Sequence, residues 1–160
     1  MKKAVFKTKE KVLLAFTGVT LLFIWIHSCM PPELSSDESG WVMKLIEPFL
    51  ELIVGKGNVT EHLVRKLAHF TEFSALGFEL GLISRTDILN NIQNRAARIT
   101  ACCAGGLFTA FCDETIQIFS GRGDSIPDVW LDFSGVVFGM IIACTALLLI
   151  KKKRVCEEEK

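Results

Sequence analysis

Apolar residues along the chain are collected into four long segments, at residues 12–29, 67–84, 99–119 and 130–150. The first contains no Asp, Glu, Lys or Arg, and the last contains one charged residue, Asp132, close to its start. A helix needs roughly 20 mostly apolar residues to cross a bilayer core about 30 Å thick. The pattern therefore predicts an all-α membrane protein with four transmembrane helices, which form one domain that takes in the whole chain.

The two middle segments are less uniformly apolar than the other two, because they carry several ionisable residues. His69, Glu72 and Glu79 lie in the second, and Asp113 and Glu114 lie in the third. A soluble helical bundle is the alternative for these two, but helices of that kind are apolar on one stripe, whereas these are apolar on most faces. We therefore favour four spans, with two spans as the fallback.

Basic residues are concentrated in three of the segments that flank the spans. Residues 2–11 carry five lysines, residues 85–98 carry three arginines, and residues 151–154 are all basic, whereas residues 31–66 are net acidic. Cytoplasmic segments of membrane proteins carry the excess of Lys and Arg. Both termini are thus predicted to be cytoplasmic, with residues 30–66 forming an outer loop.

The outer loop contains an amphipathic stretch of its own at residues 41–53. Trp41, Leu45, Phe49 and Leu52 recur at helical spacing, and charged residues occupy the other faces. This pattern predicts a short helix that lies in the outer membrane interface. Packing of the same stretch on the outer ends of the spans is the alternative.

The lysine-rich start followed by an apolar stretch is also typical of a secretory signal peptide. No small-x-small cleavage site follows the stretch, and Ile26-His27-Ser28-Cys29 is a poor lipoprotein site because His precedes the small residue. The first segment is therefore expected to remain in the membrane as an uncleaved helix.

Cysteine usage points away from a disulfide framework or a metal centre. The chain contains no C-x-x-C pair, and most of its cysteines fall inside the predicted spans or on the cytoplasmic side. Such residues are expected to be free thiols that pack as small apolar side chains. We expect the protein to have no cofactor and no metal, and the six cysteines to be free thiols; they are Cys29, Cys102, Cys103, Cys112, Cys144 and Cys156.

Polar side chains inside the predicted spans gather in the outer half of the membrane. An ionisable group in hydrocarbon costs ~2.5–3.5 kcal/mol on insertion scales, which makes it a functional candidate by default. Structural hydrogen bonds between helices are the alternative, but they stabilise by only ~0.6 kcal/mol on average. We predict one outward-opening polar pocket formed by Lys66, His69, Glu72, Asp113, Glu114, Gln117, Arg122, Asp128 and Asp132.

The spacing of these residues supports a shared pocket. Lys66, His69 and Glu72 are three residues apart in turn, so they lie along one side of a helix. Asp113 and Gln117 are one helical turn apart near the outer end of the third span.

Two G-x-x-x-G patterns occur in the predicted spans, and they predict close helix packing. One is formed by Gly77 and Gly81, and the other by Gly135 and Gly139. Glycines at this spacing let two backbones approach each other. A homo-oligomer that uses the same glycine faces stays open as an alternative.

Three motifs in these segments resemble the VanZ-like family of small bacterial membrane proteins. Residues 27–39 resemble the Ser/Pro stretch that follows the first helix of that family, and residues 66–77 resemble its K-x-x-H-F-x-E-[YF]-x-x-L-G motif. Residues 113–139, which read D-E-x-x-Q-x-F with G-R and then D-x-x-x-D-x-x-G-x-x-x-G, resemble its signature. One departure is the spacing from Phe119 to Gly121, which is one residue shorter than the common F-x-x-G-R form.

The resemblance implies an integral protein of the cell membrane that is associated with resistance to teicoplanin and related lipid-bearing glycopeptides. Three hypotheses follow. The first is an envelope protein that binds a lipid-linked or glycopeptide-type ligand without catalysis. The second is an enzyme that modifies a lipid headgroup or envelope polymer, through acid–base chemistry or a metal held by His69 and carboxylates. The third is a small transporter or channel.

The net charge of the chain disfavours one class of binding partner. The 18 basic and 18 acidic residues cancel, and half of the chain is apolar. Nucleic-acid binding usually needs a basic face, so we expect no nucleic-acid partner. Membrane lipids are the expected partners instead.

Overall fold

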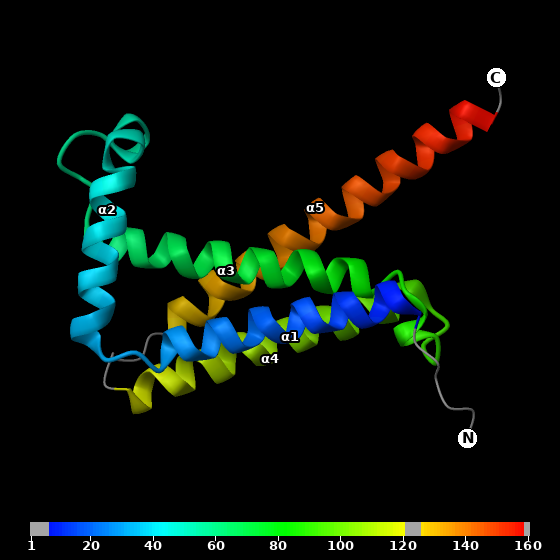
Figure 1. Cartoon of the computed structure of the whole chain (residues 1–160), viewed down its shortest axis with the longest axis horizontal. Helices are drawn as coiled ribbons and strands as arrows, with labels where there is room; N and C mark the ends of the chain where they lie inside the picture. The colour runs from blue at the N-terminus through cyan, green and yellow to red at the C-terminus, as the bar shows by residue number, and fades with distance from the viewer. Residues whose placement is uncertain (1–6, 121–125, 159–160) are drawn as a thin grey trace.

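The chain folds into five α-helices and one short 3-10 helix over residues 7–120 and 126–158, the parts that this computed structural model describes (Figure 1). These elements are α1 (Thr8–Ser28), α2 (Pro32–Val54), α3 (Glu61–Ile83), η1 (Asp87–Leu89), α4 (Arg95–Phe119) and α5 (Ile126–Glu158). No strand occurs within the described ranges, so the predicted all-α class is confirmed.

Polar caps start α3 and α4 ahead of their apolar segments. The Thr60 hydroxyl accepts a hydrogen bond from the backbone N–H three residues later at 3.2 Å. The Asn94 side chain accepts one from the N–H two residues later at 2.9 Å. Each cap satisfies a backbone donor that the first turn of a helix leaves free. The helices therefore begin at Glu61 and Arg95 rather than at the apolar residues of the predicted spans.

The interfacial helix expected at residues 41–53 is part of a longer helix, α2. It begins at Pro32, whose fixed φ and missing N–H suit the first helical position. It ends before Gly55, which has a φ of 89°, in the left-handed region that favours glycine. α2 lies crosswise to α1 and α3 at one end of the molecule (Figure 1).

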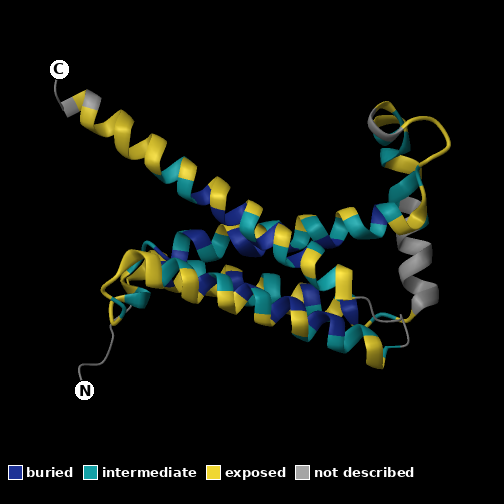
Figure 2. Cartoon of the chain, turned by 180° about the vertical axis from the view of Figure 1, so that it is seen from behind, coloured by how far each residue is buried: buried dark blue, intermediate teal, exposed yellow. Residues whose placement is uncertain are grey.

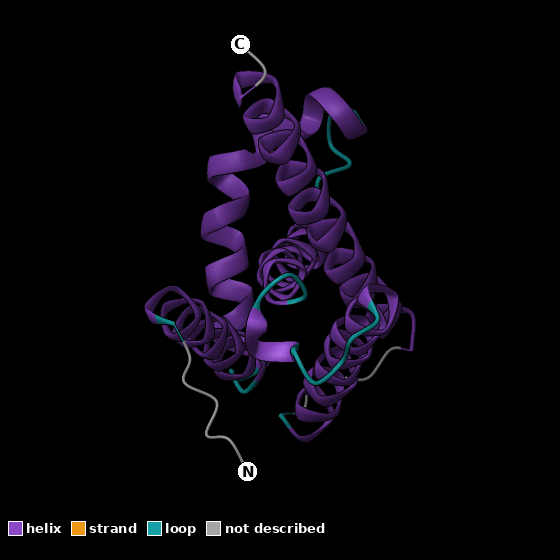
Figure 3. Ribbon diagram, turned by 90° about the vertical axis from the view of Figure 1, so that its right-hand side faces the viewer, coloured by secondary structure: helices purple, strands orange, loops and turns teal. Residues whose placement is uncertain are grey.

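The helices α1, α3 and α4 run lengthwise beside one another, and Figure 3 looks along this bundle. α5 starts at the end of the bundle next to α2, packs most extensively on α3, and then extends away from the other helices. An apolar core fills the interior, and its fully buried members are Ile24, Phe73, Leu76, Ala110 and Val136.

The contact between α3 and α5 is made by the two G-x-x-x-G segments. A Cβ atom on Gly77 would overlap the backbone of Val136, and one on Gly139 would overlap the carbonyl oxygen of Ser74. These glycines are therefore occupied by packing within one chain, and larger residues would push the two backbones apart.

Exposed residues occur along all of the helices of the bundle (yellow in Figure 2), and many of them are large and apolar. Phe16 of α1 is 63% exposed and Phe108 of α4 is 68% exposed. Polar residues are buried instead, and they include His69, Asp113 and Asp132. This distribution is the reverse of that in a soluble protein, where charged groups are almost never fully buried.

Two described helices are long and apolar enough to cross a membrane. They are α1, with a mean hydropathy of 1.6 in its most apolar window, and α5 over Ile126–Val155, with 2.5. Among the described helices, α3 and α4 do not reach this criterion. The first and fourth predicted spans thus coincide with candidate membrane helices by length and composition, and the second and third coincide with amphipathic helices of the bundle.

Candidate functional site

Four helices bring polar side chains together at the end of the bundle next to α2. α1 contributes its last turn, α4 its last two turns and α5 its first two turns, while α3 contributes its first half. We use the term polar cluster for His27, Ser28, His69, Glu72, Asp113, Gln117 and Asp132, which contact one another there.

Asp113 lies at the centre of the polar cluster and is fully buried. The Ser28 hydroxyl donates a hydrogen bond to Oδ1 of Asp113. The Gln117 amide donates to Oδ2 at 2.8 Å from the next turn of α4. Each oxygen of the Asp113 carboxyl group therefore accepts one hydrogen bond, and the two bonds together fix the orientation of the group.

His69 lies between two buried carboxylates. Its Nδ1 atom is 3.7 Å from Oδ2 of Asp113 and 3.9 Å from Oδ1 of Asp132. Both distances exceed the range of a hydrogen bond to a ring nitrogen. The three side chains are 8%, 0% and 2% exposed, so water has little access to the space between them.

A second histidine extends the polar cluster into α1. The Nδ1–H of His27 donates to Oε1 of Glu72 at 2.9 Å. The His27 ring also stacks on the ring of His69, with centroids 5.9 Å apart and planes inclined by 12°. This contact joins α1 to the side of α3 that carries the polar residues.

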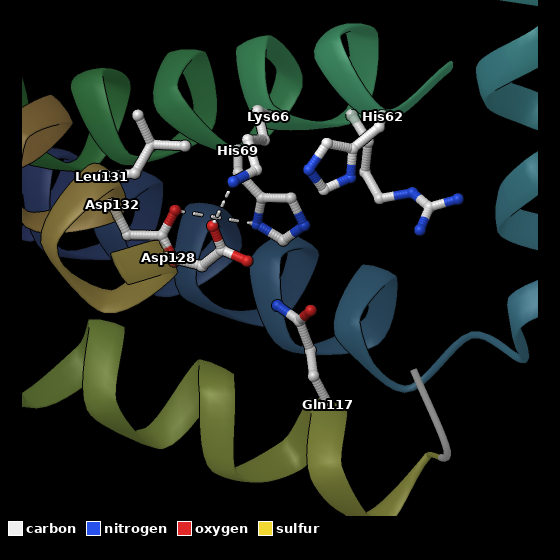
Figure 4. Close-up of a pocket in the computed structure, with 8 residues that line it drawn as sticks. His62, Lys66, His69, Gln117, Asp128, Leu131 and Asp132 are labelled. Carbon is white, nitrogen blue, oxygen red and sulfur yellow. Dashed lines mark ion pairs between the residues drawn. The ribbon is translucent and has the colours of Figure 1, made fainter. Parts of the chain in front are cut away.

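A cavity of about 110 Å³ opens beside His69 and Asp132 (Figure 4). Lys66 pairs with Asp128 there at 2.7 Å, and both side chains are partly exposed, at 36% and 29%. The ion pair therefore lies nearer to solvent than the buried His69. The cavity is lined by His62, Arg65, Lys66, His69, Gln117, Asp128, Leu131 and Asp132.

Among the described residues predicted for the pocket, Glu72, Asp113 and Glu114 do not line this cavity, although Glu72 and Asp113 belong to the polar cluster. Glu114 is buried but does not line the cavity. Glu72 borders a different, largely apolar groove between α1 and α3, together with Thr20 and Phe23. Arg122 lies outside the described residues.

Glu79 lies further along α3 than the residues of the polar cluster. Its Oε1 atom accepts a hydrogen bond from the Thr20 hydroxyl at 2.8 Å. This pair is separate from the polar cluster, because neither Thr20 nor Glu79 belongs to it.

Sequence reasoning missed His27, Ser28, His62 and Arg65 as members of the site. A signal for His27 was present, because it is the single ionisable residue in the first apolar segment up to residue 28. Ser28 carried no such signal, since a buried serine in a membrane helix commonly hydrogen-bonds to its own backbone.

The polar cluster lies inside a stretch that matches a known family. A scan against protein-family models matches residues 13–149 to VanZ/LLP1. The chain belongs to the VanZ/LLP1 family. The resemblance seen in the sequence motifs is thus confirmed, and the match includes most of α1 and α5 and all of α2, α3 and α4.

VanZ/LLP1 proteins are membrane-associated, which agrees with the two candidate spans in α1 and α5. Comparison with curated proteins and with solved structures finds no match. In this VanZ/LLP1 protein the buried His69 and Asp132 line a cavity, and the buried Asp113 lies next to His69. Such groups are suited to proton transfer, to binding of a polar ligand or to coordination of a cation.

Proposed function

We propose that this protein is a four-span protein of the bacterial cell membrane with both termini in the cytoplasm. We further propose that its polar cluster binds a lipid-linked or amphipathic ligand at the outer leaflet. Through this binding the protein lowers susceptibility to teicoplanin-like glycopeptides.

The exposed apolar surface supports four spans. Phe108 and Phe111 of α4 are 68% and 62% exposed, whereas Asp113 and Glu114 of the same helix are buried. A soluble helix would place these groups the other way round. In a membrane, lipid covers the phenylalanines, and the carboxyl groups face the interior of the bundle.

The two ends of the bundle support the orientation. At the end opposite the polar cluster, Lys7 pairs with Asp87 at 2.6 Å, close to Arg85 of the same region. Lys7, Lys9 and Arg85 lie together at this end, and such basic residues are enriched in the cytoplasmic segments of membrane proteins. At the other end α2 runs crosswise with Phe49 and Leu52 71% and 85% exposed, as expected for a helix in the outer interface.

The convergence of side chains from α1, α3, α4 and α5 at one end of the bundle is the observation that carries the proposal. Each of these four helices places an ionisable group there, although such groups are costly in hydrocarbon. The cavity beside them has a basic side formed by His62, Arg65 and Lys66, which suits an anionic headgroup. The apolar groove at Phe23 and Glu72, between α1 and α3, suits an acyl chain.

A susceptibility assay tests this function. The full chain is expressed in a glycopeptide-susceptible host, and the minimum inhibitory concentration of teicoplanin is compared with that of empty vector. We expect the wild-type chain to raise it at least fourfold and Asp113→Ala to abolish the increase. Equal membrane abundance of the two chains, measured by immunoblot, shows that the variant is present.

Glu79→Gln is the matched control for this assay. It alters a carboxyl group of α3 that lies outside the polar cluster and hydrogen-bonds Thr20. It should therefore keep the full increase in teicoplanin resistance. If cells that express the wild-type chain are as susceptible as cells with empty vector, the proposed resistance role is rejected. If Asp113→Ala gives full resistance, the polar cluster has a structural role only.

Proton transfer is a second candidate function, favoured by the position of His69. Its Nδ1 atom lies within 4 Å of Asp113 and Asp132, next to the cavity. A positioned imidazole flanked by carboxylates is a common general acid or base. Lipid extracts from cells that express the wild-type chain or His69→Gln would differ in headgroup composition if the protein modifies lipids.

A further inference from the structure

We infer that His69, Asp113 and Asp132 form a binding site for a divalent transition-metal cation, with zinc as the best fit. One ligand atom from each of these side chains lies within 4.8 Å of the others, and all three residues are buried. The site stands apart from the proposed resistance role, because a cation can bind whether or not the protein affects susceptibility to glycopeptides.

The spacing suits a shared cation better than direct hydrogen bonds. Nδ1 of His69 is 3.7 and 3.9 Å from the two carboxylate oxygens, too far for a hydrogen bond. Ligands at about 2.0–2.2 Å from a tetrahedral zinc ion lie about 3.3–3.6 Å from one another. Small side-chain rotations would therefore bring the three groups onto one ion.

Asp132 supplies the independent observation that points to a ligand. Its side chain is 2% exposed and lines the cavity beside His69. Within the described part of the chain its one polar contact is His69 at 3.9 Å, so no hydrogen bond compensates the buried carboxyl group. A buried carboxylate that accepts no hydrogen bond is unfavourable, and a bound cation would offset this cost.

Charge at the site also favours a cation. Asp113 and Asp132 are two buried carboxyl groups, and the nearby Lys66 pairs with Asp128 at 2.7 Å instead. A divalent ion would balance two carboxylates at once. The single imidazole favours zinc over magnesium, because magnesium takes oxygen ligands and retains water.

The surroundings of Asp113 are those of a metal ligand. Carboxylates that bind metals are usually held by hydrogen bonds from neighbouring groups, which fix their direction. Ser28 donates to Oδ1 of Asp113, and Gln117 donates to Oδ2 at 2.8 Å. Ser28 comes from α1 and Gln117 from the next turn of α4, so the carboxylate is held from two directions.

The cavity would leave one coordination position open. His69 and Asp132 both line it, and its volume of about 110 Å³ admits small oxygen ligands. Three protein ligands with one open position are typical of zinc sites that bind or activate an oxygen-containing group. An anionic oxygen, such as that of a phosphate or carboxylate, is the class of ligand that this position would take.

Zinc binding to the purified full-length chain in detergent tests the inference. Metal is first removed with a chelator, and zinc is then titrated in competition with a chromophoric indicator. We expect the wild-type chain to bind one more zinc ion per chain than Asp132→Asn or His69→Gln, or to bind it at least tenfold more tightly. Background binding by the six cysteines is the same in all of these chains and cancels.

Glu79→Gln serves again as the control and should bind zinc like the wild type. Zinc should also raise the midpoint of thermal unfolding of the wild type and of Glu79→Gln, but not of Asp132→Asn. Zinc binding by the wild type that does not exceed that of Asp132→Asn overturns the inference. If Asp132→Asn does not fold, the same comparison with His69→Gln decides.

The two proposals fail separately. If the wild-type chain confers resistance but does not bind zinc more tightly than Asp132→Asn, the metal site is rejected and the resistance role is retained. Zinc binding without any change in teicoplanin susceptibility retains the metal site and rejects the resistance role.

Discussion

The imidazole ring of His27 stacks on that of His69, with centroids 5.9 Å apart and planes inclined by 12°. These residues come from α1 and α3, and His27 also donates a hydrogen bond to Glu72 at 2.9 Å. The first helix is thereby fixed to the polar side of α3. A residue that the sequence places at the end of a plain apolar helix thus becomes part of the site.

Loss of the imidazole at His27 should destabilise the protein. In His27→Ala the Oε1 atom of Glu72 loses its hydrogen bond, and its Oε2 atom is already buried without a partner in the described chain. We expect the free energy of unfolding in detergent to fall by about 1–3 kcal/mol. A double-mutant cycle with Glu72→Gln measures the coupling, and strictly additive effects would contradict a direct interaction.

An alanine at Gly139 should disrupt the crossing of α3 and α5. Its Cβ atom would overlap the carbonyl oxygen of Ser74, which belongs to the helix backbone and cannot rotate away. We expect a loss of about 1–3 kcal/mol of stability, seen as a lower midpoint of thermal unfolding. Gly105→Ala is the matched control, since a Cβ atom at Gly105 would meet nothing within 4 Å.

Reporter fusions should reveal an even number of crossings. An enzyme that is active only outside the cytoplasm should be active after residue 57 and after residue 120, and inactive after residue 90 and at the C-terminus. The reason is the excess of basic residues in the segments predicted to be cytoplasmic. Activity of the fusion after residue 90 would show that α3 does not cross the membrane.

The ion pair between Lys7 and Asp87 predicts a pH dependence at the opposite end of the bundle. Its hydrogen bond and charge raise the pKa of the Lys7 amine above 10.5 and lower the pKa of the Asp87 carboxyl below 3.8. The lowered carboxyl pKa means that the contribution of Asp87 is present above pH 3.8 and is lost as pH falls through the folded value. The raised amine pKa means that the contribution of Lys7 is present below pH 10.5 and is lost as pH rises through the folded value.

Carbon-detected NMR titration of Asp87 in detergent measures the carboxyl pKa directly. Lys7→Gln should bring it back toward 3.8, because the partner that stabilises the charged carboxylate is gone. Lys9→Gln is the control, and it should leave the carboxyl pKa in place. An equal shift in both variants would mean that general charge, rather than the contact with Lys7, lowers the carboxyl pKa.

Much of the fold could be predicted because helical order is local. Four long apolar segments in the sequence became α1, α3, α4 and α5, and the spacing of Gly77, Gly81, Gly135 and Gly139 marked the faces that meet. The sequence also showed that Lys66, His69 and Glu72 share one side of α3. These properties depend on the 3.6-residue period and on hydropathy, which a single chain segment carries by itself.

The arrangement of the site depended on how the helices are rotated against one another. Periodicity states which residues share a face, but it does not state which helix that face meets. Gln117 lies one helical turn from Asp113 and was predicted to share its pocket, but the contact of Asp113 with Ser28 of α1 was decided only by tertiary packing. The same holds for the absence of Glu114 from the lining of the cavity. The sequence by itself determined that polar groups gather at one end of the bundle, and the packing of four helices decided which of them touch.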